Sequence, residues 1–461
     1  METDRSITSG KSSLPIEIVL LVIESLVPQN DKAQPILYTS HPTAQLLLSF
    51  TRVSEATYPT ACKLLWQNCL YIDTKSKLRR FRRFLSQKSP ITGQTLCEAY
   101  GSARLYLNPL HYRSDTASAF ETFSLPSSPL DVDLDNDLPD DCSDAWTDIS
   151  SNRSQIIRFH AAPEPPRSGS PVDVAYSQYS THDWKDKPMQ DLQTIHILKD
   201  VLLTLAPVLK TLIVDMPLTT LNPFKHIRFV KPLRQAFEAL VNIEELISVK
   251  DELYISTEAS LSPSQPEVWS LWPKLRRLCL YNVLVDEHLW RNMASCPQLE
   301  TALFIRQDPN EEDLSKDDIK GAWAGAWATA NSQATSDGEL VYQGPEITIA
   351  FGNWPPGLPD FSHMLPDWQK IDPCNKINVL NVATHAKNDR RARERGPIAS
   401  CQDWMRDKAL GDTLWTEVKV NGWAPFTPMI FEDGLVDEDG NMWTDEIDES
   451  PWFDGDKRLW L

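Results

Sequence analysis

Few residue patterns in this chain of 461 residues could support catalysis or bind a cofactor. No two Gly stand two apart, so the dinucleotide-binding GxGxxG loop is absent, and neither GxxxxGK[ST] nor GxSxG occurs. None of the nine His residues has a partner at HExxH spacing, which argues against a zinc hydrolase. We therefore expect a protein that is not an enzyme, with no catalytic residue, no cofactor and no metal.

One acidic run resembles the start of a calcium-binding loop. Asp131, Asp133 and Asp135 have the alternating spacing of the first ligands. However, Asn136 stands where the loop needs Gly, and Cys142 stands where it needs a bidentate Glu. We interpret the run as a solvated acidic tract.

The eight Cys residues form no CxxC pair and no zinc-type spacing with His. Reduced, buried thiols are the favoured interpretation, and they indicate an intracellular compartment. The residues are Cys62, Cys69, Cys97, Cys142, Cys279, Cys296, Cys374 and Cys401.

The net charge of -19 is concentrated in two segments. Residues 131–148 hold eight Asp and no Lys or Arg, and residues 430–461 hold eleven acids against two bases. The remainder is close to neutral, so we expect no nucleic-acid partner. The run Ile18 to Ile23 is too short to cross a bilayer, and the N-terminal residues do not resemble a secretory signal. We expect a protein of the cytoplasm, the nucleus or both, with no membrane partner.

Composition divides the chain into five parts. A helical module spans 12–72, and a helical connection with a first repeat-like segment spans 73–114. Residues 115–190 are an acidic Ser/Pro-rich stretch that we expect to be a disordered insertion. A leucine-rich region covers 191–426, and an acidic tail containing Trp covers 427–461. We expect the tail to cap the open end of the leucine-rich region, with a partner-anchoring role as the alternative.

The leucine-rich region contains a weak repeat of the form apolar-x-x-apolar-x-apolar, which is typical of the strand in a leucine-rich repeat. The spacing is 34, 32 and then 24 residues, against a usual period of about 20–29. We therefore predict an α/β fold in which an irregular helix/strand solenoid binds a target, with a plain α/β sheet domain as the alternative. The four predicted strands begin at Leu209, Ile243, Leu275 and Leu299.

The sequence from Leu14 to Leu26 predicts a helix that is apolar nearly all round. Pro15 suits the first helical position, and Glu17 lies in the first turn, where a carboxylate interacts well with the helix dipole. A helix of this kind must be covered on more than one side. The rest of a small module covers one side only, so the other side needs a following domain or a second protein. The alternative is a core helix of one large domain.

A second helix precedes Val53 and a third follows Pro59. The combination resembles the F-box, in which Leu-Pro-x-Glu opens the first helix and Val-Ser and Leu-Trp follow. It departs from that family at 29–41, which looks like an inserted loop, and at Tyr58, where the family often has Trp. The matching positions are Leu14, Pro15, Glu17, Ile23, Leu26, Val53, Ser54, Tyr58, Leu65 and Trp66.

The resemblance implies a function. F-box proteins dock onto the Skp adaptor of a cullin-RING (SCF) ubiquitin ligase, and a C-terminal region, frequently of leucine-rich repeats, captures a protein substrate. This chain would then be a substrate receptor that supplies no catalytic group. The alternatives are an F-box-like scaffold outside ubiquitination and an unrecognised hydrolase or transferase. The residues implied to contact the adaptor are Leu14, Pro15, Ile18, Ile23, Leu26, Val53 and Trp66.

A basic helix is predicted over about 75–85, where Lys and Arg alternate with apolar residues. We expect its apolar face to pack on the N-terminal module and its basic face to lie in water. The alternative is a surface for lipid or nucleic acid.

Overall fold

The structure is a computed structural model of the full chain. The chain divides into two units, and every described residue belongs to the first, Met1–His111 with Pro188–Ile430. The predicted disordered insertion, 115–190, and the predicted tail, 427–461, lie outside the described residues, as does the tract at Asp131. The structure describes residues 14–27, 34–89, 91–110, 191–218, 223–253, 255–258, 265–306, 318–331, 340–353, 364–384 and 397–422.

The first three helices are those expected within 12–72. They are α1 (Ile16–Ser25), α2 (Pro42–Phe50) and α3 (Tyr58–Asn68). Both α1 and α2 have a Pro at or beside the first helical residue, where a missing N–H costs nothing. Helix α3 contacts both α1 and α2, so it is the central helix of this N-terminal module.

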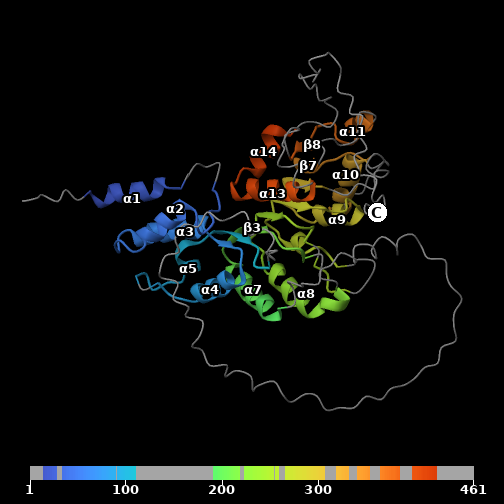
Figure 1. The fold of residues 1–461 in the computed structure, drawn as a ribbon. Helices are drawn as coiled ribbons and strands as arrows, with labels where there is room; N and C mark the ends of the chain where they lie inside the picture. The colour runs from blue at the N-terminus through green and yellow to red at the C-terminus, as the bar shows by residue number, and fades with distance from the viewer. Residues whose placement is uncertain are drawn as a thin grey trace, which may run out of the picture. The chain divides into compact units, whose positions relative to one another are not determined.

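Strands and helices then alternate along the chain (Figure 1). The strands are β1 (Tyr71–Ile72), β2 (Ala103–Leu107), β3 (Leu209–Val214), β4 (Glu245–Ser248), β5 (Arg277–Tyr281), β6 (Thr301–Ile305), β7 (Ile347–Asn353) and β8 (Ile377–Ala383). The helices between them are α4 (Lys75–Leu85), α5 (Leu96–Tyr100), α7 (Leu192–Leu205), α8 (Pro223–Glu238), the 3-10 helix η5 (Val268–Leu271), α9 (Glu287–Ala294), α10 (Ile319–Ala330) and α11 (Leu365–Ile371). Two further helices, α13 (Pro397–Leu410) and α14 (Leu414–Asn421), follow β8.

The strands form one open sheet of eight in which neighbours in sequence are neighbours in space, in the order β1-β2-β3-β4-β5-β6-β7-β8. Every neighbouring pair is parallel. A parallel pair needs a crossover connection, and helices lie in the connections between strands. These observations confirm the predicted α/β class.

The four predicted strands are β3 to β6, and their register agrees with the predicted repeat. Leu212 pairs with Leu246, Leu246 with Leu278, and Leu278 with Ala302. The middle apolar position of each repeat therefore lies in one row across the sheet. Strand β2 lies within the first repeat-like segment predicted over 73–114, whereas β1, β7 and β8 were not predicted.

The two faces of the sheet have separate cores. The row of Leu212, Leu246 and Leu278 belongs to the larger core, which it shares with α7, α8, α9 and α10. The alternate residues Ile213 and Ile247 point to the other face and belong to a second core. The described strand residues are therefore buried or nearly so on both sides.

Helices α13 and α14 cover this second face. Met405 of α13 and Leu414 and Val418 of α14 are buried against the sheet residues. The surface that the strands of a repeat stack would offer to a target is thus covered by the chain itself. Figure 1 shows both helices, in orange and red, beside the strands.

A buried ion pair also holds α13 on the sheet. Asp215, which follows β3, is fully buried and accepts hydrogen bonds from Arg406 Nε and the Tyr106 hydroxyl, each at 2.6 Å. Lys250 Nζ lies 3.9 Å from the same carboxylate and donates to Gln402 of α13 at 2.8 Å. A buried carboxylate needs such partners because its desolvation is costly.

The basic helix α4 is present, and its apolar face packs only partly on the predicted module. Leu78 and Leu85 share the larger sheet core with Trp66 and Ile72 of that module, and the helix also contacts α7. The basic side lies in water as expected, with Arg79, Arg80, Arg82 and Arg83 exposed, and Arg82 also pairs with Asp200 of α7 at 2.7 Å.

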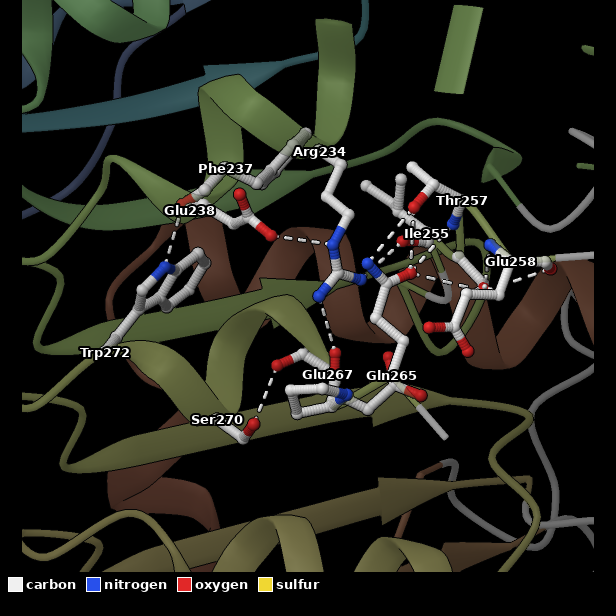
Figure 2. Close-up of polar contacts among 12 residues, drawn as sticks. Arg234, Phe237, Glu238, Ile255, Thr257, Glu258, Gln265, Glu267, Ser270 and Trp272 are labelled. Atoms are coloured by element: carbon white, nitrogen blue, oxygen red, sulfur yellow. Dashed lines mark hydrogen bonds and ion pairs between the residues drawn. The ribbon is translucent and has the colours of Figure 1, made fainter. Parts of the chain in front are cut away.

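Arg234 fixes the rotation of α8 (Figure 2). Its side chain is 6% exposed and donates to the carbonyl oxygens of Ile255 at 2.8 Å and Pro266 at 2.9 Å. Trp272 adds a hydrogen bond from its indole N–H to the Phe237 carbonyl, at 2.8 Å. These contacts tie α8 to the residues around Ile255, Pro266 and Trp272.

Replacing Arg406 by Ala should reduce the free energy of unfolding by about 3 kcal/mol or more, because it leaves the Asp215 carboxylate buried without its closest cation. Urea denaturation measures the change. The control is Arg276→Ala, since Arg276 and Glu300 form an exposed pair at 2.6 Å and such pairs contribute about 0–1 kcal/mol. Equal, small losses in both variants would contradict the importance of the buried pair.

Candidate partner-binding surface

Helix α1 is present where the sequence predicted it, but it begins at Ile16 and not at Pro15. Pro15 has extended backbone, with φ -52° and ψ 140°, and Ile16 is the first helical residue. Glu17 lies in the first turn, where its charge interacts favourably with the helix dipole. No side chain caps this end of the helix.

One stripe of α1 is buried in the module. Ile23 and Val27 are 0% and 2% exposed and pack with Leu47 of α2 and Leu64 of α3. Val19, Leu20 and Leu26 flank them and are partly buried. These positions repeat every three or four residues, so they lie on one side of the helix.

The opposite side of α1 is also apolar, and it faces solvent. Leu14 is 68% exposed and Leu21 is 60% exposed, and between them lies the exposed Ile18. Val22 extends this surface along one edge. At 100° per residue, Ile18 and Leu21 lie roughly opposite Ile23. We call Leu14, Ile18, Leu21 and Val22 the outer stripe of α1.

The module has further exposed apolar residues beyond α1. Leu46 and Leu48 project from α2, and Val53, which follows α2, is 65% exposed. Single exposed apolar residues are ordinary on proteins, but several on one small module are typical of a surface that a partner covers.

The structure divides the seven residues predicted to contact an adaptor. Leu14, Pro15, Ile18 and Val53 are exposed, and Leu26 is partly buried at the edge of the module core. Two assignments need correction: Ile23 and Trp66 are packing residues.

Ile23 is fully buried at the centre of the module core, so its role is to hold α1 on α2 and α3. Trp66 is 2% exposed and belongs to the larger sheet core, and its indole N–H donates to the Gly101 carbonyl at 3.2 Å. It therefore joins α3 to the first strands of the sheet. Neither side chain has surface to offer a partner in this structure.

Leu21 and Val22 were missed as site residues. Both belong to the apolar run that the sequence displays, and Val22 stands four residues after Ile18. Leu21 lies roughly opposite Ile23, and the four-residue spacing places Val22 beside Ile18. Assigning Ile23 to the core first would have identified them.

Two carboxylates with raised pKa values lie close together beyond β4. Burial raises the pKa of Glu252 to about 7, and the nearby carboxylate of Glu267 adds to the effect. Burial also raises the pKa of Glu267, whose Oε1 lies 3.4 Å from His288 Nε2. Among the described residues, no three His, Cys, Asp or Glu side chains are grouped to hold a metal ion. The absence of enzymatic activity stays a prediction.

Comparisons of the chain with protein-family models, with curated proteins and with solved structures find no match. Within the ranges that the structure describes, no helix has both the length and the apolar character needed to cross a bilayer.

The two stripes of α1 should differ in their effect on stability. Ile23→Ala should lower the free energy of unfolding by about 2–5 kcal/mol, because it opens a cavity in the module core. Ile18→Ala should change it by less than about 0.5 kcal/mol, because that side chain already faces water. Chemical denaturation of the two variants measures the difference. Equal losses would mean that the outer stripe is covered by the chain itself.

Glu252 should make stability depend on pH. Its pKa of about 7 in the folded chain lies above the ordinary value of 4.5, so protonation favours folding. This contribution is complete below about pH 4.5 and is lost as the pH rises towards 7. The Tm of Glu252→Gln relative to the native protein should therefore increase between pH 5 and pH 7 and then level off. A constant difference across that range, like that expected of the exposed Glu287→Gln, would contradict the raised pKa.

Proposed function

We propose that this protein is an F-box-like substrate receptor of an SCF-type ubiquitin ligase, whose N-terminal module docks a Skp-type adaptor. The observation that carries the proposal is the outer stripe of α1, an exposed apolar face on a helix whose other face already has a core. Burying one such side chain is worth about 1.5–3 kcal/mol, so several together can support stable binding.

The rest of the chain would be a leucine-rich-repeat-like solenoid that positions the target. The sequential parallel strands and the row of Leu212, Leu246 and Leu278 support this interpretation. The irregular period and the covering of the second sheet face by α13 and α14 are departures from a simple repeat. A target would therefore be bound by helices or loops and not by the strands.

The proposed mechanism is proximity. The module holds the ligase, the solenoid holds the target, and the ubiquitin-conjugating enzyme gains effective concentration at a target lysine. The receptor supplies no proton donor, nucleophile or cofactor of its own.

A scaffold that binds Skp without ubiquitination would use the same stripe. Co-purification separates the two functions: Skp and a cullin together support the ligase receptor, whereas Skp without a cullin supports the scaffold.

Leu21→Glu/Val22→Glu should weaken binding of a purified Skp-type adaptor to the full chain at least a hundredfold. The substitution removes two apolar contacts and introduces two charges that must be desolvated on binding. Each tenfold loss of affinity corresponds to about 1.4 kcal/mol. Isothermal titration calorimetry measures the affinity, and the Tm should be nearly unchanged because both positions are exposed.

The matched control is Leu284→Glu/Val420→Glu, which changes the same residue types at exposed positions away from the module. It should bind the adaptor as the native chain does. The proposal fails if the native chain shows no adaptor binding, or if both double variants bind equally well.

A further inference from the structure

Three neighbouring helices outside the module carry an excess of basic side chains. Helix α4 has six Lys or Arg and no acid, it contacts α7, and α7 contacts α8 (Figure 1). Between α7 and α8 lies a shallow groove that is open to solvent. Its lining residues are His196, Lys199, Ile227, Arg228, Lys231, Pro232 and Gln235.

One side of α8 packs inward and the other lines the groove. Phe229, Leu233 and Phe237 are buried, and Arg234 at the edge of this side donates to the carbonyls of Ile255 and Pro266 (Figure 2). Residues 227, 228, 231 and 235 repeat every three or four positions and are exposed. Lys199 of α7 donates to Gln235 at 2.7 Å, which joins the two walls.

The acids of these three helices are already engaged. Asp191 lies 3.5 Å from Lys75, and Asp200 lies 2.7 Å from Arg82. Glu238 pairs with Arg234 at 2.7 Å. In the parts of the chain that the structure describes, no carboxylate lies within ion-pair distance of Arg228 or Lys231. The guanidinium of Arg228 lies 4.8 Å from the centre of the Phe229 ring, and neither base is neutralised by a carboxylate of the described residues.

The groove also has an apolar part. Ile227 is 44% exposed, and Pro232 contributes to the lining beside it. A polyphosphate would gain nothing from these two residues, whereas a peptide could place an aliphatic side chain there.

We propose that the α7–α8 groove binds an acidic segment of a partner protein, with an aliphatic side chain seated on Ile227 and carboxylates on Arg228 and Lys231. Helix α4 extends the positive potential and attracts the segment from solution. The proposal does not depend on the ligase function, because its test needs no adaptor.

The test uses the full chain and a fluorescent peptide of twelve residues with eight Asp or Glu and two Leu. Fluorescence anisotropy should show saturable binding that weakens as salt rises from 50 to 200 mM. Arg228→Glu/Lys231→Glu should weaken binding by at least about thirtyfold, because two attractions become repulsions. Ile227→Ser should weaken it by about tenfold, because the aliphatic contact is lost.

The charge-matched control is Arg291→Glu/Lys370→Glu, at exposed positions of α9 and α11 with side chains 64% and 72% exposed. It makes the same change in net charge and should retain native affinity. The proposal is overturned if both double variants lose affinity equally, because net charge alone would then explain binding. It is also overturned if Ile227→Ser has no effect, or if a twenty-residue oligothymidylate or phosphatidylserine vesicles bind the groove more tightly than the peptide.

Discussion

The fold depends on one constraint: the strands are apolar on both sides, so the sheet must be covered on both faces. Leu212 and its row pack against the connecting helices, and Ile213 and its row pack against α13 and α14. Parallel sheets are commonly buried in this way. The ion pair of Asp215 with Arg406 holds α13 on the second face of the sheet.

Because both faces of the sheet are covered by helices, the surfaces at which a partner could bind are restricted. A repeat stack with an open strand face could hold a target on that face, but here the face is part of a core. The surfaces that remain are on helices. The outer stripe of α1 is apolar and the groove between α7 and α8 is basic, so the two surfaces suit partners of different chemistry.

Much of the fold was predictable because its signals are local. The Leu-Pro start and dense apolar run predicted α1, and the spacing of Leu209, Leu212 and Val214 predicted a strand. Two end strands lack that spacing, since β1 has two residues and β7 reads ITIAFGN, whereas β8 has it at Ile377, Leu380 and Val382 but was not predicted. The packing of α13 and α14 on the second face of the sheet was not predicted. The buried residues of α13, which are Cys401, Met405 and Ala409, form a weak apolar pattern.

The candidate site was only partly predictable for a similar reason. Ile18 and Ile23 are the same residue type in one apolar run, and only the position of α3 decides which is buried. The sequence around Trp66 likewise did not indicate that the larger sheet core would enclose its side chain. A resemblance to a family supplies a set of positions, but packing decides which of them reach the surface.

Hydrogen–deuterium exchange of the full chain, with and without a purified Skp-type adaptor, tests the central claim most directly. If the outer stripe of α1 is the docking surface, peptides covering 14–26 should exchange at least about tenfold more slowly in the complex, since docking suppresses the local opening that exchange requires. Exchange in β3 to β6 should be unchanged. Binding that leaves α1 unprotected, or no binding at all, would contradict the account.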